Sequence, residues 1–367
     1  MKKYFIIAGE PSGDLYGGNL IRSLKEINPD TSFMGHGGDS MQKEGMKIIE
    51  HVDTLSIMGF YEVLKEIPRM WLIMKKTISL IKKSKPHRII LIDYPGFNLR
   101  LVKNIHHLKI PITYFILPQV WAWKKNKIKI IKSYVDQSIS IFPFEKQWFE
   151  NNGVSVEFFG HPLADEKHVN ESTKEFFRRH SLDITKPIIA LLPGSRQQEI
   201  NRHMNIFIDT IKLLKKEIKD IQVIIGKSPN VKLPNLPEFY KIEENSKKTM
   251  IVSTAAIVAS GTATLECVFE QTPLVVCYKL SNLSWRLIRR LVQVKYSSII
   301  NIIEDRALVP ECIQEDMNPK NILEKLLPLL DDKSEDRNNM ISDFNKIKRT
   351  LGDPGVYKRI AEAITMR

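Results

Sequence analysis

Short, continuous runs of apolar residues alternate with longer amphipathic stretches in the first half of the chain. The apolar runs cover residues 4–8, 88–92, 111–117 and 137–142, and residues 32–35 carry a weaker strand pattern. Strands that are apolar on both faces and separated by helices are typical of a parallel sheet that helices cover on both sides. The first half therefore predicts one such sheet.

The second half shows the same arrangement without repeating the sequence. A polar stretch, residues 162–186, separates the halves and is predicted to be a linker with a short helix. The pattern therefore predicts two doubly wound α/β domains, and open parallel sheets bind ligands beyond the carboxyl ends of their strands. If the domains face each other, a ligand would lie in the cleft between them. The predicted strands of this half are residues 187–192, 221–225, 255–259 and 273–278, and the predicted helices are 204–218, 322–330 and 340–366.

Composition fits two globular domains. The chain has 367 residues, 43% of them apolar and 26% charged, which is too long for one compact core and enough for two. No apolar run approaches the roughly 18 residues of a spanning helix, and the first run is shorter than the core of a signal peptide. We therefore expect that the chain does not cross a membrane by its own sequence.

Charge and cysteine content limit the surroundings of the protein. The formal net charge of +13 leaves four explanations open: a basic proteome, an anionic membrane surface, an anionic substrate, or nucleic acid. The three cysteines, Cys267, Cys277 and Cys312, form no C-x-x-C pair. An odd number without metal spacing argues against a disulfide framework and fits a reducing cytosol.

Two glycine-centred loops in the second half each follow a predicted strand and open a helix. The first holds Gly194 and Arg196, and the second is centred on Gly261. Free N–H groups at a helix start suit phosphate oxygens, and an arginine adds a charge-assisted donor. Each loop alone can also be a plain strand-to-helix turn, but two of them in one domain favour a diphosphate site. Glu266, one turn into the second helix, can accept ribose hydroxyls or satisfy helix-start amides.

Other phosphate-binding motifs are missing from the sequence. Neither loop carries the Gly-Lys-Ser/Thr of a Walker A motif or a G-x-G-x-x-G pattern, which argues against an ATPase and a nicotinamide enzyme. No Asp-x-Asp triplet occurs in the chain. We therefore expect no cofactor and no metal ligand set, so that loop amides, a helix dipole and Arg196 neutralise the leaving group.

The first half supplies a candidate general base. Asp93 follows the apolar run 88–92 directly, and partial desolvation at the end of a buried strand raises a carboxyl pKa. The alternative is that Asp93 caps the following turn. Glu10 and Asp14 are rival carboxylates, and Asp14 is also suited to capping or starting a helix. Trp121 and Trp123, two residues apart, suit stacking on a sugar, packing an acyl chain, or filling the core.

Together these motifs resemble those of the lipid-A-disaccharide synthase family. The resemblance spans residues 4–315, and the order and density of its motifs make it specific. The motifs are Gly9-Glu10-Pro11-Ser12-Gly13-Asp14, Ile92-Asp93-Tyr94-Pro95-Gly96-Phe97-Asn98, Pro118-Gln119-Val120-Trp121-Ala122-Trp123, Phe142-Pro143-Phe144-Glu145, Gly160-His161-Pro162, Leu192-Pro193-Gly194-Ser195-Arg196 and Ser260-Gly261-Thr262-Ala263-Thr264-Leu265-Glu266.

The resemblance implies a GT-B architecture and a metal-independent, inverting hexosyl transfer in lipid A biosynthesis. The donor would be UDP-2,3-diacylglucosamine and the acceptor 2,3-diacylglucosamine 1-phosphate (lipid X). The products would be the β-1,6-linked tetraacyl disaccharide 1-phosphate and UDP. It also implies a peripheral protein on the cytoplasmic face of the inner membrane of a Gram-negative bacterium, and a homodimer with exchanged C-terminal segments.

Domain bounds and site residues follow from the patterns and the resemblance together. We expect an acceptor- and membrane-facing domain at residues 1–165 and a UDP-sugar domain at 166–340. Residues 341–367 are expected to form a helix that returns to an N-terminal domain, its own or a partner's. Gly96 stands where some relatives carry a second Asp, so Asp93 alone takes the role of base. The predicted donor residues are Gly194, Ser195, Arg196, Glu199, Ser260, Gly261, Thr262, Ala263, Thr264 and Glu266, and the predicted acceptor or cleft residues are Glu10, Ser12, Gly13, Asp14, Gln119 and Asn301.

Acylated substrates require contact with a membrane, and the stretch 55–85 is the best candidate for it. Apolar residues such as Ile67 and Trp71 alternate there with lysines and arginines, as in a basic amphipathic helix pair on anionic lipid. Two ordinary helices with a buried apolar face are the alternative. The basic segments 124–132 and 285–295 would widen the patch.

Two other functions stay open from the residues alone. An enzyme similar to UDP-N-acetylglucosamine 2-epimerase would share the two domains and the UDP loops, but it would need a water-soluble substrate and no lipid patch. A basic nucleic-acid-binding protein is the remote alternative, because no recognition module occurs in the sequence.

Overall fold

The computed structural model describes residues 2–55, 60–123, 127–166, 171–229, 231–282, 284–286 and 294–366. For residues 60–65 and 123 only the backbone is described. The chain divides into two compact units. Unit 1 comprises Met1–Asp165 and Leu351–Arg367, and unit 2 comprises Glu166–Thr350.

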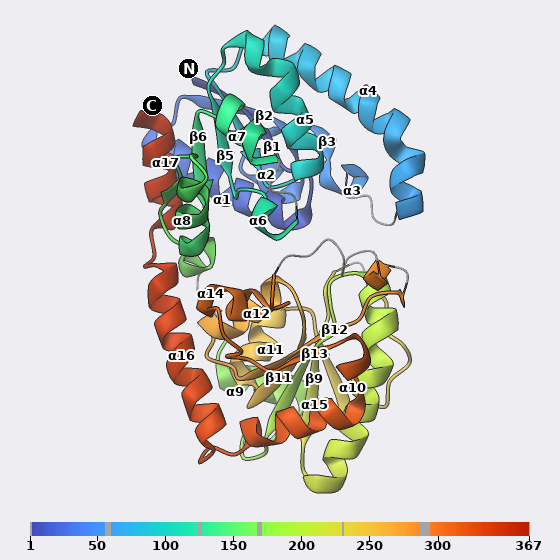
Figure 1. Cartoon of the computed structure of the whole chain (residues 1–367). Coiled ribbons are helices and arrows are strands. Elements are labelled where there is room, and N and C mark those ends of the chain that lie inside the picture. Colours follow the sequence, from blue (N-terminus) through green and yellow to red (C-terminus); the bar gives the residue numbers. More distant parts are fainter. Residues whose placement is uncertain are drawn as a thin grey trace. The chain divides into compact units, whose positions relative to one another are not determined.

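Unit 1 contains a seven-stranded, entirely parallel sheet (Figure 1). Its elements are β1 (Lys2–Ile7), α1 (Pro11–Ile27), β2 (Thr31–Gly37), α2 (Asp39–Lys43), β3 (Lys47–His51), α3 (Val52–Leu55), α4 (Phe60–Ser84), β4 (Arg88–Ile92), α5 (Pro95–Ile105), η1 (His106–Leu108), β5 (Ile112–Phe115), α6 (Val120–Trp123), α7 (Ile128–Tyr134), β6 (Gln137–Ser140), α8 (Pro143–Asn151), β7 (Glu157–Phe158), η3 (Pro162–Asp165) and α17 (Val356–Met366). The strand order is β3-β2-β1-β4-β5-β6-β7.

Helices cover both faces of this sheet. Alternate residues of β1 and β4, such as Phe5 and Leu91, are fully buried with side chains from α4, α5 and α7. The other face receives α1, where Gly13 and Gly17 approach Ala8 and Ile92 closely. Burial on both faces explains why the central strands are continuous apolar runs.

Unit 2 contains a six-stranded, entirely parallel sheet of order β10-β9-β8-β11-β12-β13. Helices α10 and α15 pack together, and α11 contacts α12 beside the sheet. The elements are α9 (Thr173–His180), β8 (Ile188–Leu192), α10 (Gln197–Glu217), β9 (Gln222–Gly226), β10 (Tyr240–Glu243), α11 (Ser246–Val252), β11 (Ala255–Ala259), α12 (Thr262–Phe269), β12 (Leu274–Tyr278), α14 (Ile299–Glu304), β13 (Glu311–Ile313), η4 (Gln314–Asp316), α15 (Pro319–Leu326), η5 (Leu327–Leu330) and α16 (Glu335–Leu351). The predicted α/β class with two doubly wound parallel sheets is confirmed.

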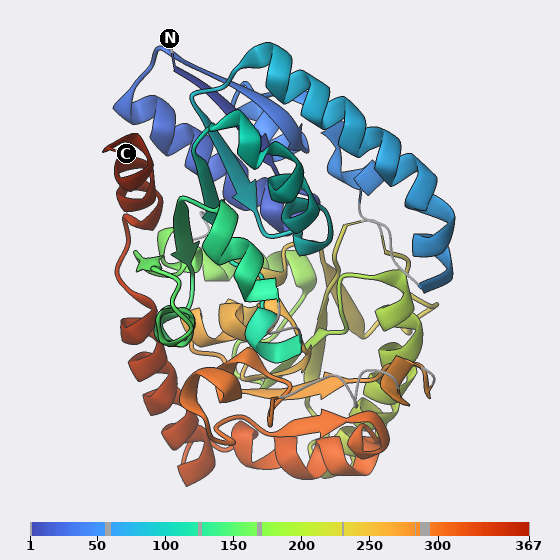
Figure 2. The same ribbon diagram turned by 45° about the horizontal axis from the view of Figure 1, so that its top comes forward.

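The C-terminal stretch differs from the single helix that its periodicity predicts. Two helices, α16 and α17, are separated by a non-helical segment that contains Gly352, Pro354 and Gly355 (Figure 2). Both glycines have positive φ angles, +99° and +92°, which favour glycine and end a helix. Helix α16 ends where unit 2 ends, and α17 lies along α1 in unit 1.

The carboxylate of Asp165 binds the start of α17 within unit 1. Asp165 accepts hydrogen bonds from the backbone N–H groups of Gly355, Val356 and Tyr357, the last at 2.8 Å. These are amides at the start of a helix, which have no partner within the helix itself. In the part of the chain that the structure describes, no helix is long and apolar enough to cross a membrane.

Candidate active site

The loops after three neighbouring strands of unit 1 carry the predicted acceptor residues. Strands β1, β4 and β5 are adjacent and parallel, so their carboxyl ends lie at one edge of the sheet. Glu10 follows β1, Asp93 follows β4 and Gln119 comes shortly after β5. The topology thus brings these three residues to the same edge, which is where ligands of such sheets bind.

Asp93 has an unusual backbone conformation that its neighbours stabilise. Its φ angle is +44° and that of Tyr94 is +50°, and such left-handed residues cost on the order of 1–3 kcal/mol each. The carbonyl oxygen of Asp93 accepts hydrogen bonds from the amide of Asn98 and the hydroxyl of Tyr114, both at 2.7 Å. Asn98 and Tyr114 are fully buried, so hydrogen bonds from the core of unit 1 stabilise the turn that contains Asp93.

The surroundings of Asp93 favour its protonated form. Burial is the main cause and the nearby Glu10 carboxylate adds to it, which together raise the pKa of Asp93 to about 7, against a smaller opposing effect of the Tyr94 N–H. A general base is most effective when its pKa lies near the working pH. The electrostatics therefore suit Asp93 to accept a proton near neutral pH.

The other predicted residues of this edge have different environments. Glu10 is half-buried, whereas Ser12 and Gln119 are exposed. Gly13 is buried, and a Cβ there would lie 3.2 Å from that of Ala8, so this glycine serves close packing of α1.

Asp14 has a structural role, as its capping interpretation suggests. Its carboxylate is 5% exposed and accepts from the N–H groups of Gly38, Ser40 and Met41 at 2.6–3.1 Å. It therefore caps α2 and not its own helix. Both carboxylate oxygens are engaged by the chain, which supports the capping alternative for Asp14 over a role in the acceptor site.

Trp121 belongs to the core of unit 1. Its side chain is 8% exposed, and its indole N–H donates to Glu145 at 3.1 Å. Burial raises the pKa of Glu145 to about 8. These contacts fit the core-filling alternative for Trp121. The side chain of Trp123 and residues 124–126 lie outside the described residues, so the prediction for Trp123 stays a prediction.

The first glycine loop of unit 2 offers fewer free amides than its sequence suggests. Glu199, in the first turn of α10, accepts from the N–H groups of Ser195 and Arg196 at 3.0 and 3.2 Å. Gly194 has a φ of +124°, and a Cβ there would lie 2.4 Å from the Glu199 carboxylate. A helix-capping glutamate thus takes the amides of Ser195 and Arg196. Among the described residues, no acceptor is found for the N–H groups of Gln197 and Gln198 in the first turn of α10. The prediction of free amides is therefore wrong for Ser195 and Arg196 only. Arg196 itself is exposed, with a guanidinium nitrogen 3.8 Å from Glu199.

The second glycine loop is open. Among the described residues, no hydrogen-bond acceptor is found for the backbone N–H groups of Gly261, Thr262 and Ala263. A Cβ on Gly261 would meet no atom within 4 Å. Thr264 is buried, and its hydroxyl donates to the Gly261 carbonyl at 2.7 Å. The loop thus presents unpaired amides and the positive end of α12 to an anion.

Glu266 lies half-buried on α12 among charged groups of the same unit. Burial, with smaller contributions from the carboxylates of Glu166 and Glu270, raises the pKa of Glu266 to about 7, and Lys247 opposes them. Among the described residues, no hydrogen bond to its carboxyl group is found.

Asn301 is buried, and its side-chain polar atoms bond to the chain itself. Its amide nitrogen donates to the Val309 carbonyl and to Glu311, and its amide oxygen accepts from the N–H groups of Leu308 and Val309, all at 2.8–2.9 Å. A carboxamide has two donors and two acceptor positions, and here all four are used by the chain itself. The prediction of a cleft residue at Asn301 therefore lacks a free atom to support it.

His203 is a residue that sequence reasoning passed over. It is fully buried on α10 and accepts from the Lys279 N–H at 3.2 Å, while its other ring nitrogen donates to the Pro193 carbonyl at 2.8 Å. It therefore joins the loops after β8 and β12. Nothing in the sequence around position 203 distinguishes this histidine from one on a helix surface.

Solved structures of similar fold include epimerases and glycosyltransferases. The UDP-GlcNAc 2-epimerase from Neisseria meningitidis, bound to UDP-GlcNAc, aligns with a TM-score of 0.68 at 14% identity, covering 100% of both chains. The calicheamicin glycosyltransferase CalG4 aligns with a TM-score of 0.63 at 12% identity, covering 100% of this chain and 99% of that one. The fold is thus the GT-B type, which glycosyltransferases and these epimerases share.

Sequence comparison is more specific. The family model described as lipid-A-disaccharide synthetase matches residues 4–359. The lipid-A-disaccharide synthase of Coxiella burnetii is 33% identical over 99% of this chain and 98% of its own, and that of Myxococcus xanthus is 32% identical over 99% and 96%. The chain belongs to the lipid-A-disaccharide synthetase family, and it is a glycosyltransferase. The epimerase alternative holds for the fold alone.

Proposed function

We propose that this protein transfers the sugar of UDP-2,3-diacylglucosamine to the 6-hydroxyl of 2,3-diacylglucosamine 1-phosphate. The products are the β-1,6-linked tetraacyl disaccharide 1-phosphate and UDP. The family supports this reaction, and one observation in the structure carries the mechanism. Asp93 lies at the end of β4. Its carbonyl oxygen accepts hydrogen bonds from Asn98 and Tyr114, and its pKa is raised to about 7.

Unit 1 supplies the base in this proposal. The Asp93 carboxylate removes the proton of the acceptor hydroxyl as the oxygen attacks the anomeric carbon, so the two oxygens must come within roughly 3 Å. Single displacement inverts the anomeric centre of the donor sugar. Glu10 and Gln119 lie at the same edge of the sheet and are available for hydroxyl groups of the acceptor.

Unit 2 binds the leaving group. The amides of Gly261, Thr262 and Ala263 receive the diphosphate, and the start of α12 stabilises the charge that develops as the bond to UDP breaks. Arg196 is exposed and adds a cation. Glu266 accepts hydrogen bonds from the ribose hydroxyls.

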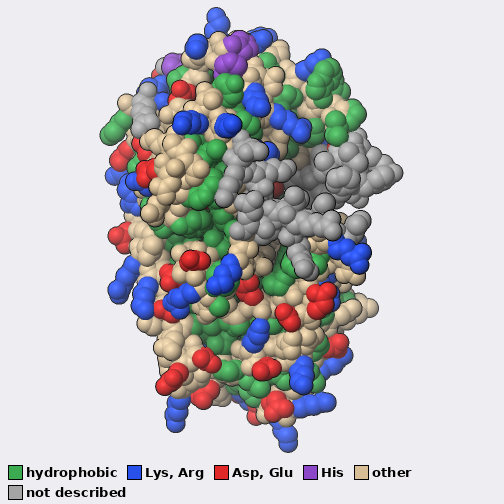
Figure 3. Space-filling model, viewed as in Figure 1, with side chains coloured by type: hydrophobic (Ala, Val, Ile, Leu, Met, Phe, Trp, Pro, Cys, Tyr) green, Lys and Arg blue, Asp and Glu red, His purple; other side chains and the backbone are tan. Residues whose placement is uncertain are grey.

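A peripheral membrane site on α4 is the second part of the proposal. Ile67, Trp71 and Leu72 are 51%, 56% and 61% exposed, and the Lys75 ammonium lies 3.4 Å from the centre of the Trp71 ring. Hydrophobic side chains gather over α4 beside lysine and arginine in Figure 3. This combination of exposed apolar side chains and cations suits an anionic lipid surface. Residues 56–59 and 287–293, also expected in this patch, lie outside the described residues, as do the side chains of 60–65.

A homodimer with exchanged C-terminal segments is the assembly we propose. Helix α17 buries Val356, Ile360 and Ile364 against unit 1 and is connected through the non-helical segment 352–355. The same contacts can be made with unit 1 of a second copy, since exchange of an identical element needs no new interface.

Asp93→Asn tests the reaction. Asparagine tolerates the left-handed backbone and keeps the size of the side chain, but it cannot take a proton. We expect turnover of the two acylated substrates to fall by about 100-fold or more, while calorimetry shows unchanged UDP affinity. Near wild-type turnover would refute the role of Asp93. Loss of UDP binding together with activity would show that the substitution disturbs more than the base.

A further inference from the structure

The buried Asn301 is part of a hydrogen-bond network that ends at the second glycine loop. All its polar atoms bond to the chain, and one of its partners is the carboxylate of Glu311, the first residue of β13. Sequence reasoning selected Asn301 but not Glu311, because no motif surrounds it. The contacts of Glu311 explain why an asparagine is needed at a position whose polar atoms are all bonded to the chain.

Glu311 gathers three donors from one short segment. Its carboxylate accepts from the N–H of Ser297 at 3.0 Å, from the N–H of Ser298 at 2.8 Å and from the Asn301 amide at 2.8 Å. Ser298 caps the start of α14. Hydrogen bonds to an ionised acceptor are about twice as strong as neutral ones. The carboxylate therefore sets the position of the segment from Ser297 to Asn301.

That segment in turn contacts the donor loop directly. The carbonyl oxygen of Ser297 accepts a hydrogen bond from the hydroxyl of Ser260 at 3.1 Å. Ser260 precedes Gly261 and the unpaired amides at the start of α12. A chain of contacts thus runs from Glu311 through Ser297 to the loop that receives the diphosphate.

We propose that Glu311, with Asn301, is a positioning residue for the UDP-sugar donor, acting on the second glycine loop through Ser297 and Ser260. The inference rests on the proposed function, because it assigns the donor to that loop. Misplacing a preorganised donor by about 1 Å weakens binding and catalysis markedly. In this role, Glu311 and Asn301 act through the backbone of Ser297 and not by direct contact with the donor.

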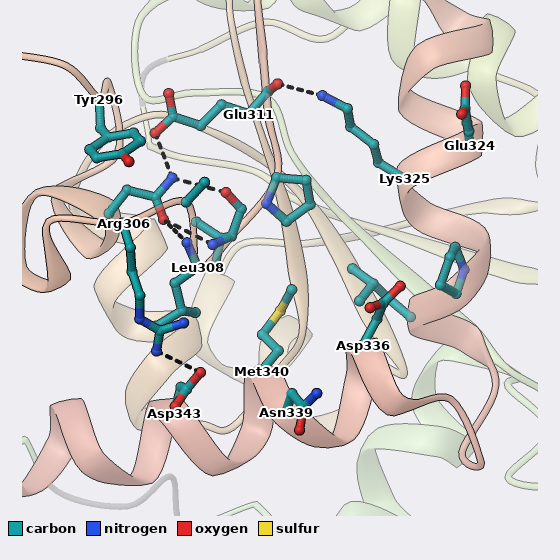
Figure 4. A pocket seen from close by; sticks show the side chains of 16 residues that line it. Tyr296, Arg306, Leu308, Glu311, Glu324, Lys325, Asp336, Asn339, Met340 and Asp343 are labelled. Carbon is teal, nitrogen blue, oxygen red and sulfur yellow. Dashed lines mark hydrogen bonds and ion pairs between the residues drawn. The ribbon is translucent and has the colours of Figure 1, made fainter.

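The side-chain contacts of Glu311 can be changed without changing its backbone contact. Glu311 lines a cavity of about 640 Å³ together with Arg306, Lys325 and Glu324 (Figure 4). The backbone carbonyl of Glu311 accepts from Lys325 at 2.8 Å, so a side-chain substitution leaves this contact in place. In Glu311→Gln, the new NH₂ group would face an N–H donor, and at least one of the carboxylate's hydrogen bonds would be lost.

The experiment measures UDP affinity by calorimetry and the KM values of both substrates in the full-length protein. We expect Glu311→Gln to weaken UDP binding and to raise the donor KM on the order of tenfold, the loss expected for one hydrogen bond to a charged group. The acceptor KM should not change. Glu324→Gln is the matched control, since it removes a carboxylate from the same cavity without touching the segment 297–301.

A double-mutant cycle separates positioning from a general loss of stability. If Glu311 acts through the Ser260 hydroxyl, Glu311→Gln should weaken UDP binding less in a Ser260→Ala background than in the wild type. Glu311→Asp keeps the charge but shortens the side chain, and it should give an intermediate affinity. It also serves as the test if Glu311→Gln does not fold.

The outcomes distinguish this inference from the proposed function. UDP affinity in Glu311→Gln no lower than in Glu324→Gln, or effects that add fully with Ser260→Ala, would overturn the positioning role and leave the proposed function intact. A wild-type protein that does not bind UDP would overturn both.

Discussion

Asp93 combines a strained backbone with a carboxyl group whose pKa is raised to about 7. The two properties have one origin. The left-handed turn carries the side chain to the end of a buried strand, where burial disfavours its charge. The hydrogen bonds from Asn98 and Tyr114 to its carbonyl oxygen keep it there. At the scale of the residue, the fold therefore disfavours the charged form of the carboxyl group that is proposed to accept the proton.

The pH dependence of turnover tests this environment. Asp93 must be ionised to act as a base, so the rate should fall on the acid side with an apparent pKa near 7. The Glu10 carboxylate contributes to the rise, and Glu10→Gln removes its negative charge. Ionisation of Asp93 then becomes easier, and the acid limb should move to lower pH by about half a unit.

The measured quantity is the pH at which the rate falls on the acid side, and not the maximal rate. Glu10 is itself a candidate acceptor residue, so its substitution can also change the maximal rate. Glu150→Gln, an exposed carboxylate at the end of α8, is the control and should leave the limb in place. A limb that stays unchanged in Glu10→Gln would contradict the coupling between Glu10 and Asp93.

At the scale of elements, apolar runs located the central strands except β2, whose pattern is weaker, and they located no edge strand. Strands β1, β4, β8 and β11, among others, are buried on both faces and stand out as continuous apolar runs. The edge strands β3, β7, β10 and β13 are short and partly exposed, so polar residues interrupt them. Their pairing depends on a neighbouring strand that is distant in sequence.

Helix α4 gives a prediction at the same scale. A variant with Ile67, Trp71 and Leu72 replaced by serine should lose much of its sedimentation with vesicles of anionic phospholipid. Each exposed apolar side chain contributes roughly 1.5–3 kcal/mol when it is buried. Turnover on a detergent-dispersed donor should persist, because the substitutions are on the surface.

The control for α4 replaces exposed apolar side chains elsewhere. Ile184 and Ile242, in unit 2, are 68% and 46% exposed, and their replacement by serine should not affect sedimentation. If the α4 variant sediments like the wild type, α4 is not the membrane contact.

At the scale of the whole molecule, one carboxylate ties the end of the chain to unit 1. Asp165→Ala removes the acceptor for three amides at the start of α17, which should cost about 1–2 kcal/mol. We expect a Tm lower by several degrees and faster tryptic cleavage after Lys358 and Arg359. UDP affinity should not change, because the donor loops belong to unit 2.

Light scattering on the same pair of proteins tests the assembly. A wild-type dimer that becomes monomeric in Asp165→Ala would support exchange of the C-terminal segment, since α17 is then held less firmly. A wild-type monomer would contradict the exchanged dimer. Unchanged proteolysis and Tm in Asp165→Ala would show that the buried side chains of α17 are sufficient to hold it.

The sequence by itself determined the fold class, the central strands, the family and the positions of Asp93 and the two glycine loops. These depend on local patterns: burial on both faces, glycines after strands, and motifs in a fixed order. The tertiary structure alone decided the roles of Asp14, Glu199 and Asn301, whose polar atoms are engaged by amides of the chain. It also revealed His203 and Glu311. A hydrogen bond is satisfied by whichever partner folding brings near, and residues such as Glu311 and Ser297 come together only in the folded chain.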